Sequence, residues 1–287
     1  MFMGDQAEAL RRMVNRKTRS KPRVIAVTSG KGGVGKTNVS VNLALKLVQS
    51  GYKVVLFDAD LGLANVDIVL GLAPAFTLAD VLKGNKSVEE IMIDGPLGLK
   101  VLPGGSGVYD LANLSQWRLQ EFINALMVLE RNFDFVIIDT GAGLHKTVLS
   151  FVLSVEEVLV VTTPEPTALT DAYGMIKVIK QQNPNTSVSI IANMVSSPSD
   201  GDGVARKLNL VLKQFMNCEV GYAGCVMLDD SVSRSVVEQS PFVLSYPSSL
   251  ASRSIDKIAQ YLLGETKRRN ETGIRAFFNK MYSLLQK

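Results

Sequence analysis

From residue 23 onward, short runs of apolar and often β-branched residues alternate with longer segments of helical period. The runs predict strands at 24–28, 53–57, 99–102, 135–138, 158–162, 188–192 and 220–226. The segments between them predict helices that include 37–49, 115–131, 170–181 and 204–216. Several of the strands are apolar on both faces, which is typical of parallel strands covered by helices on both sides. The pattern therefore predicts an α/β fold with a doubly wound, mostly parallel sheet flanked by helices.

This pattern divides the chain into three segments, a central domain and two terminal elements. No linker rich in proline, glycine or serine divides residues 23–264, so we expect a single domain there. Residues 1–22 predict a short accessory helix near 4–14 followed by a basic linker, and residues 265–287 predict a C-terminal accessory helix from about residue 272. We treat these two ends as elements separate from the domain.

The C-terminal segment is amphipathic. Its large apolar residues fall on one helical face and are Ile274, Phe277, Phe278, Met281, Leu284 and Leu285. The basic run Lys267-Arg268-Arg269 precedes them and suits anionic headgroups, so we predict a membrane-targeting helix that lies in the interface. The alternative is an ordinary terminal helix packed on the domain, and the two arrangements are compatible as two states of one switch.

Composition and charge narrow the class of protein. Hydrophobic residues make up 46% of the chain and charged residues 20%, which is typical of a globular protein. The two cysteines, Cys218 and Cys225, are too few for a disulfide scaffold. Without a signal peptide or an apolar run long enough to span a membrane, we expect a cytoplasmic protein. The net charge of +4 comes from the two ends, because the body between them is net acidic, and this argues against a broad nucleic-acid-binding face.

A phosphate-binding motif follows the first predicted strand. It reads Gly30-Lys31-Gly32-Gly33-Val34-Gly35-Lys36-Thr37 and leads into an amphipathic helix that continues with Asn38. This is the full G-x-x-x-x-G-K-T pattern in its context of strand, loop and helix. Glycines let the backbone N–H groups point at phosphate oxygens, Lys36 neutralises phosphate charge, and the Thr37 hydroxyl is a ligand for Mg²⁺. The motif predicts binding of ATP or ADP together with Mg²⁺.

Aspartates end two of the other predicted strands. Asp58 and Asp60 follow one strand, and Asp139 follows another. Because the carboxyl ends of parallel strands meet at one edge of the sheet, we expect these carboxylates to lie near the phosphate loop.

The second lysine of the loop, Lys31, is typical of the deviant Walker A box, and the sequence resembles the superfamily of MinD, ParA and the nitrogenase iron protein. The resemblance implies a homodimer in the ATP state, with Lys31 reaching the partner subunit's phosphates and thereby coupling hydrolysis to association. It also implies that Asp60 orients the attacking water, that Asp139 holds Mg²⁺ with Thr37, and that Asp58 supports the site. Asn193, at the end of a predicted strand, matches the position that reads the adenine edge, whereas the segment 226–230 lacks the proline that often precedes the acidic residue of the family's adenine-side loop.

Within that superfamily the sequence resembles the flagellar-number regulators of the FlhG (FleN or YlxH) family. The resemblance is carried by four segments: 5–11, with Asp5, Gln6, Ala7, Leu10 and Arg11; 58–67; 139–143; and 164–173. It implies an ATPase switch that regulates flagellar number and placement and associates reversibly with an anionic membrane surface on the inner face of the cell membrane. It also implies two kinds of protein partner, which are an FlhF-type GTPase stimulated through the N-terminal helix and the flagellar switch (C-ring) proteins.

Two alternatives belong to other functional classes. A ParA-type DNA-partitioning ATPase needs basic residues gathered on one face, yet the body is net acidic. A metabolic ATP-dependent enzyme needs a second set of acid and base residues, for which the sequence offers no candidate. Iron–sulfur carriers need suitably placed cysteines, and Cys218 and Cys225 lie in neither of the two switch segments. His145, the single histidine, is interpreted as an exposed loop residue.

Overall fold

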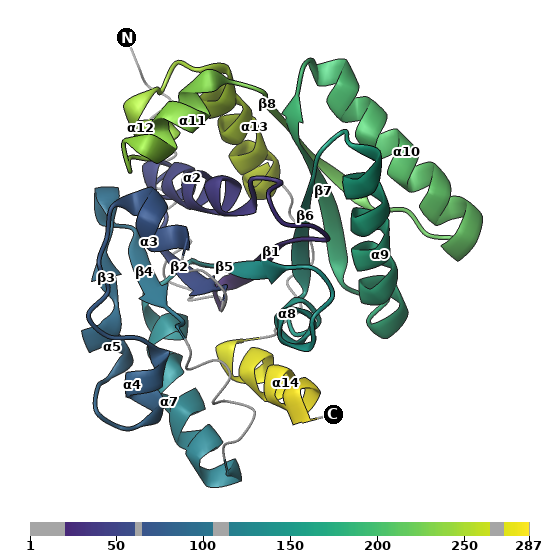
Figure 1. Cartoon of the computed structure of the whole chain (residues 1–287). Helices are drawn as coiled ribbons and strands as arrows, with labels where there is room; N and C mark the ends of the chain where they lie inside the picture. Colours follow the sequence, from purple (N-terminus) through teal and green to yellow (C-terminus); the bar gives the residue numbers. More distant parts are fainter. Residues whose placement is uncertain (1–20, 61–64, 106–114, 265–272, 287) are drawn as a thin grey trace, which may run out of the picture.

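The described part of the chain forms one sheet with helices on both faces (Figure 1). The computed structural model describes residues 21–60, 65–105, 115–264 and 273–286. The predicted N-terminal helix, with Asp5, Gln6, Ala7, Leu10 and Arg11, lies outside the described residues.

The sheet has eight described strands in the order β3-β4-β2-β5-β1-β6-β7-β8. Neighbours from β4 to β8 pair in parallel, while β3 runs antiparallel to β4 at one edge. The strands are β1 (Arg23–Ser29), β2 (Val54–Ala59), β3 (Ile93–Asp94), β4 (Lys100–Pro103), β5 (Phe135–Ala142), β6 (Glu157–Thr162), β7 (Ser187–Val195) and β8 (Gly221–Met227). Because β5 lies between β1 and β2, the carboxyl ends of these three strands are adjacent, where open α/β sheets bind ligands. The predicted fold class is confirmed.

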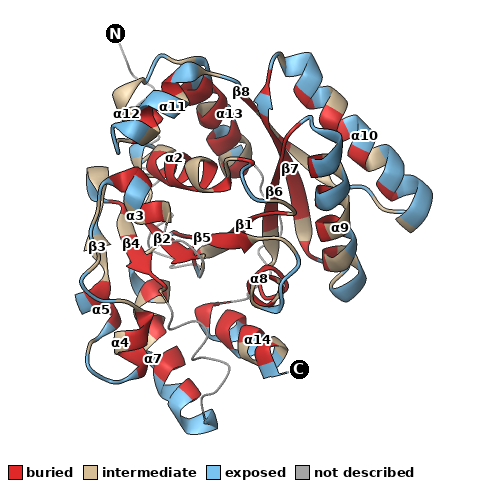
Figure 2. Ribbon diagram, in the orientation of Figure 1, coloured by how far each residue is buried: buried red, intermediate tan, exposed pale blue. Residues whose placement is uncertain are grey.

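Helices cover both faces of the sheet. Successive strand residues point to opposite faces, so Ala26 and Val136 belong to one hydrophobic core, whereas Ile25 and Ile137 belong to the other. Helices α2 and α13 cover the second core, and α7, α8, α9, α10 and α14 cover the first. The described helices are α2 (Lys36–Gln49), α3 (Asn65–Leu70), α4 (Leu78–Leu82), α5 (Val88–Ile91), the 3₁₀ helix η1 (Pro96–Gly98), α7 (Gln116–Asn132), α8 (Lys146–Val152), α9 (Pro166–Gln182), α10 (Pro198–Met216), α11 (Asp230–Val237), α12 (Phe242–Ser245), α13 (Leu250–Gly264) and α14 (Ile274–Gln286). In Figure 2 the inner strands, such as β2 and β6, are red over most of their length, as expected of strands buried on both faces.

Predicted and observed elements differ at helix starts and at the carboxyl ends of strands, where β5 and β7 extend past the predicted residues 138 and 192 to Ala142 and Val195. Helix α9 begins at Pro166 rather than at residue 170, and α10 begins at Pro198 rather than at residue 204. Proline at the first helical position has its φ preset, and the Ser197 side chain caps α10 by accepting from the Asp200 N–H, so both helices begin before their first periodic apolar residue. The prediction gave no bounds for the two-residue strand β3 or for α13, whose buried residues follow helical spacing. It also gave none for the shorter helices α3, α4, α5, η1, α8, α11 and α12.

The C-terminal helix α14 packs against α7 and α8. Ile274, Phe277, Phe278 and Met281 are each at most 1% exposed, Leu285 is buried, and Leu284 is half-buried. The Phe278 ring meets Phe122 of α7 edge-on with ring centroids 5.7 Å apart, and the Phe277 ring lies 6.2 Å from that of Phe151 in α8. The structure therefore has the packed arrangement that the sequence left open beside the membrane-bound one, and the face predicted to contact lipid belongs here to the first core.

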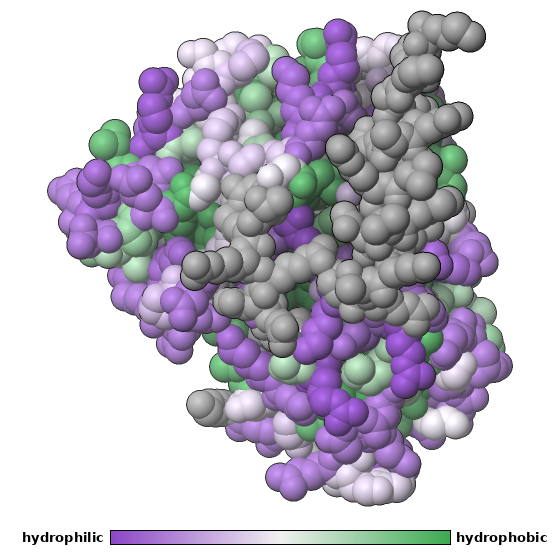
Figure 3. Space-filling view, turned by 180° about the vertical axis from the view of Figure 1, so that it is seen from behind, coloured by the Kyte–Doolittle hydropathy of each residue, from purple (hydrophilic) through white to green (hydrophobic). Residues whose placement is uncertain are grey.

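The described surface is otherwise ordinary for a globular protein. Seen from behind, it is largely hydrophilic, with hydrophobic residues interspersed (Figure 3). Within the described residues, no helix combines the length and the apolar character needed to cross a bilayer.

Candidate nucleotide site

The phosphate loop joins the end of β1 to the first turn of α2, as the motif predicts. Gly35 precedes α2 with a left-handed backbone, φ 81°, and offers no side-chain cap. The first turn of the helix also contains no acidic residue. The N-terminal N–H groups of α2 are thus left for an anion, and the helix dipole favours negative charge at the same place.

Two glycines of this loop are required by their surroundings. A Cβ on Gly30 would overlap the backbone of Asp171 in α9, and a Cβ on Gly35 would overlap the side-chain amide of Asn193. The phosphate loop therefore packs closely against α9 on one side and the end of β7 on the other, which fixes the positions of the loop's backbone N–H groups.

Three side chains of α2 converge on Asp139 of β5, whose side chain is fully buried. The Lys36 ammonium donates to Asp139 Oδ1 at 3.0 Å, and the Ser40 hydroxyl donates to the same oxygen at 2.7 Å. The Thr37 hydroxyl donates to Asp139 Oδ2 at 2.8 Å. The structure thus brings together the lysine, the hydroxyl and the carboxylate that the motif assigns to phosphate and Mg²⁺.

Asp58 lies on the neighbouring strand, in register with Asp139. Burial, and to a smaller extent the nearby charge of Asp139, together raise the pKa of the Asp58 carboxyl from 3.8 to about 7. The Asp60 backbone N–H donates to Asp58 Oδ1 at 3.1 Å. A Cβ built on Gly141 would lie 3.5 Å from Asp60 Oδ1, which places the Asp60 carboxylate opposite the segment that follows Asp139. The three predicted aspartates therefore meet at one edge of the sheet.

Lys31 lies apart from this cluster. Its ammonium is 3.1 Å from Glu165 Oε2 and 3.1 Å from Thr167 Oγ1, both at the start of α9, and its side chain is 41% exposed. The second lysine of the motif is therefore at the rim of the site, whereas Lys36 is inside it. Its role toward a partner subunit stays a prediction.

Asn193 is buried against the phosphate loop. Its amide Nδ2 donates to the Val34 carbonyl at 2.7 Å, and the next residue, Met194, has a left-handed backbone with φ 57°. The side chain thus lies beside the loop, and its reading of the adenine edge stays a prediction. Asn38, in the first turn of α2, has a buried side-chain oxygen to which no described group donates a hydrogen bond.

Sequence reasoning missed Ser40, Glu165 and Thr167 as members of the site. Ser40 follows Lys36 by four positions and Thr37 by three, so helical spacing alone places it on the same face of α2. Glu165 and Thr167 could not be found in this way, because their approach to Lys31 depends on how α9 packs beside the loop.

The remaining candidate residues have structural positions. His145 is exposed and precedes α8, and Cys218 and Cys225 are free thiols that pack at the edge of the first core. Among the described residues, no group of three histidine, cysteine or acidic side chains could hold a metal ion by itself. A metal held through Thr37 and Asp139 would complete its shell with nucleotide oxygens and water, which is how Mg²⁺ is commonly bound.

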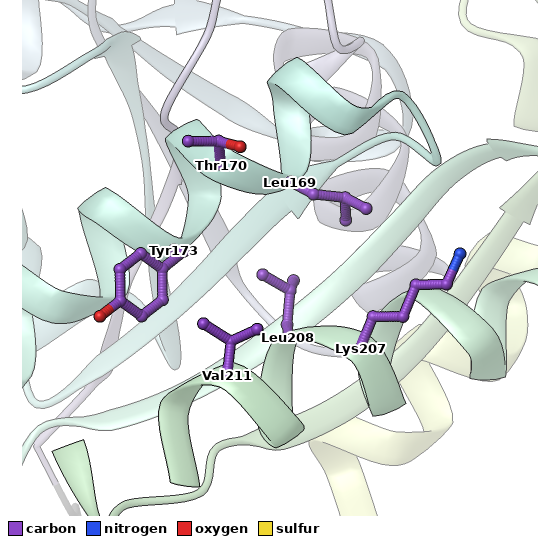
Figure 4. A pocket seen from close by; sticks show the side chains of 6 residues that line it. All are labelled: Leu169, Thr170, Tyr173, Lys207, Leu208 and Val211. Atoms are coloured by element: carbon purple, nitrogen blue, oxygen red, sulfur yellow. The ribbon is translucent and has the colours of Figure 1, made fainter. Parts of the chain in front are cut away.

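A hollow of about 270 Å³ lies between α9 and α10, away from the phosphate loop (Figure 4). It is lined by Leu169, Thr170, Tyr173, Lys207, Leu208 and Val211. Phe215, one turn beyond Val211 on α10, is 67% exposed. This surface is apolar and holds none of the predicted site residues, which is typical of a protein-interaction surface rather than of a second catalytic site.

The residues of the loop fit a magnesium nucleotide. The uncapped N-terminus of α2 and Lys36 suit phosphate, and the hydroxyl and carboxylate oxygens of Thr37 and Asp139 are the hard ligands that Mg²⁺ prefers. When bound, the metal would neutralise charge on the phosphates. Asp60 lies at the same edge, and its role in orienting a water stays a prediction. The fold and the site define a P-loop nucleotide hydrolase with a second lysine in its phosphate loop.

Comparisons with known proteins agree with this class. The ParA family model, described as NUBPL iron-transfer P-loop NTPase, matches residues 21–263. The antiactivator FleN of Pseudomonas aeruginosa is 43% identical over 237 residues, which are 83% of this chain and 85% of FleN. The flagellum site-determining protein YlxH of Helicobacter pylori is 36% identical and covers 99% of this chain and 100% of its own length. Among solved structures, the septum site-determining protein MinD of Pyrococcus horikoshii, complexed with Mg-ADP, is 27% identical with a TM-score of 0.67 and covers 86% of this chain and 99% of that one.

The chain therefore belongs to the ParA/MinD family of P-loop ATPases and, within it, to the group of FleN and YlxH. As a member of that family it is an ATPase, and the P. horikoshii MinD complex supports its use of nucleotide and Mg²⁺.

Proposed function

We propose that this protein is an ATP-dependent dimerising switch that regulates the number and placement of flagella. The observation that carries the proposal is that the two lysines of the loop occupy different positions and have different partners. Lys36 is buried against Asp139, while Lys31 lies at the exposed rim and pairs with Glu165. A rim lysine can supply positive charge to a second subunit's phosphates only when two subunits meet, which would link hydrolysis to dimerisation.

The flagellar part of the proposal is supported by the relatives. FleN is named an antiactivator and YlxH a flagellum site-determining protein, and both align with most of this chain. The apolar surface on α9 and α10 supports the existence of a protein partner, for which we propose the flagellar switch (C-ring) proteins.

The N-terminal segment extends the proposal to a second partner. Ala7, Leu10 and Val14 fall at helical spacing and give a narrow apolar stripe, and Gln6 could reach the nucleotide of an FlhF-type GTPase. A peptide of residues 1–21 should therefore accelerate that GTPase. The Gln6→Ala peptide should bind without stimulating, and equal stimulation by both peptides would refute the role of Gln6.

The C-terminal helix α14 extends the proposed function to membrane binding. We propose that α14 packs on α7 and α8 in the monomer and is released onto an anionic membrane in the ATP dimer, so that a cytoplasmic protein becomes peripheral on the inner face of the cell membrane. The face that would insert is the one buried here, so on release its side chains would pass from the protein core into lipid, while the apolar surface of α7 and α8 that they cover, with Phe122 and Phe151, would become exposed. Two released helices on one dimer bind with an avidity that one helix lacks.

Liposome sedimentation tests this function. With vesicles that contain anionic lipid, the full chain should bind with ATP and fail to bind with ADP. Phe277→Glu should eliminate binding, because it places a charge on the inserting face. Ser283→Glu, which adds the same charge at an exposed position of the same helix, is the matched control and should retain most of the binding. Equal binding by a chain that lacks residues 272–287 would refute the membrane role of α14.

A further inference from the structure

Ser40 is a buried hydroxyl that the phosphate-loop motif does not assign. It lies in the second turn of α2, is fully shielded from solvent, and contacts Asp139 Oδ1 at 2.7 Å. The same hydroxyl lies 3.1 Å from the Lys36 carbonyl. A hydroxyl has one proton, and the charged carboxylate is both the nearer and the stronger acceptor, so Ser40 donates to Asp139.

The other two donors to Asp139 have further work in a nucleotide site. Lys36 is the residue that the motif commits to the phosphates, and Thr37 is the one that it commits to Mg²⁺. When both side chains turn to their ligands, Asp139 keeps one of its three present donors. That donor is Ser40, whose position on the α2 backbone is fixed relative to Thr37 three residues earlier.

We propose that Ser40 is a positioning residue that holds the Asp139 carboxylate in the orientation required for Mg²⁺. The inference rests on the proposed Mg²⁺-nucleotide site and adds to it the side chain that orients the carboxylate ligand of the metal. Because Asp139 is fully buried, water cannot replace a lost donor without cost, and a carboxylate without this donor would be free to turn away from the metal.

The test is nucleotide binding measured by calorimetry across a titration of Mg²⁺, with ADP so that no hydrolysis occurs. Ser40→Ala should raise the Mg²⁺ concentration for half-maximal enhancement of ADP affinity about tenfold or more, as is usual when the group that orients a metal ligand is lost. ADP affinity without Mg²⁺ should stay within about twofold of wild type, because Ser40 does not touch the phosphate cradle. Ser40→Thr keeps the hydroxyl and should restore the Mg²⁺ response.

Ser150→Ala is the matched control. Ser150 is another buried helical serine, whose hydroxyl donates to the Thr147 carbonyl in α8, and its loss should leave the Mg²⁺ response unchanged. If Ser40→Ala does not fold, Ser40→Cys keeps the side-chain size with a much weaker donor and should weaken the Mg²⁺ response in the same direction.

A wild-type Mg²⁺ response in Ser40→Ala would overturn the proposal if Asp139→Asn loses that response. If Asp139→Asn also responds normally to Mg²⁺, the metal site itself is wrong, so the two failures are distinguishable.

Discussion

Asp139 and Asp58 are neighbouring carboxylates held in different ways. Asp139 receives hydrogen bonds from Lys36, Thr37 and Ser40, which compensate its burial. Asp58 receives a backbone N–H from Asp60, and its burial and the Asp139 charge together raise its pKa to about 7. At the residue scale, the site therefore stores electrostatic repulsion that a bound cation would relieve.

Replacing Asp58 by asparagine should make stability less dependent on pH. The carboxyl has a pKa of 3.8 when unfolded and about 7 when folded, so the folded state binds more protons between these values and wild-type stability falls as pH rises from about 4 to 7. Asp58→Asn should therefore be more stable than wild type by about 2–4 kcal/mol at pH 8, relative to the difference at pH 4, since one pKa unit is worth about 1.4 kcal/mol. Urea unfolding of nucleotide-free protein at both pH values measures this, and a difference that does not change with pH would contradict the cause assigned to the shift.

At the element scale, the cap of α14 is carried by the body of the protein. Gly273 accepts the first helical hydrogen bond from the Phe277 N–H, yet glycine has no side chain with which to cap. Glu130 of α7 supplies the cap instead, with Oε2 accepting from the Ile274 N–H at 2.9 Å, and a Cβ on Gly273 would come within 2.5 Å of that oxygen. Glu130 and Gly273 line a hollow of about 310 Å³, whose lining also includes Lys21 and Arg275. Undocking α14 would therefore cost the helix its cap as well as its apolar contacts.

Glu130→Gln should loosen α14 without affecting the nucleotide site. Loss of the charged cap costs about 1–2 kcal/mol, so hydrogen exchange of the first-turn amides of α14 should accelerate about 5- to 30-fold in the monomer. Glu121→Gln removes the same charge from an exposed position of α7 and should leave exchange in α14 unchanged. Equal exchange in the two variants would mean that Glu130 contributes nothing to docking.

The same scale explains how far sequence reasoning reached. Buried strands such as β6 are apolar on both faces and were predicted within one residue, because a helix-covered strand tolerates few polar residues. The phosphate loop and the aspartates at the strand ends were predicted because one edge of a parallel sheet gathers them. The helix starts at Pro166 and Pro198 were not predicted, because they depend on proline at the first turn and, for α10, on a side-chain cap. The pairing of Lys31 with Glu165 and the cap from Glu130 were not predicted either, because each joins segments more than a hundred residues apart in the sequence.

At the scale of the whole molecule, the charges separate the body from the ends. The ends of the sequence are basic and the body is net acidic, so an anionic surface attracts the ends more than the body. The nucleotide loop at the carboxyl edge of the sheet and α14, which packs against α7 and α8, are separate regions of one fold (Figure 1). Dimerisation is the event that, in this account, connects ATP at the first region to membrane binding at the second.

Sedimentation velocity of the Asp60→Ala protein with saturating Mg-ATP tests that claim most directly. This variant keeps the phosphate cradle and loses the carboxylate that would orient the attacking water, so it should bind ATP, hydrolyse it poorly and sediment as a dimer, while with ADP it should sediment as a monomer. Lys36→Ala, which loses phosphate neutralisation, should remain monomeric with either nucleotide. An Asp60→Ala protein that binds ATP and still sediments as a monomer would contradict the account.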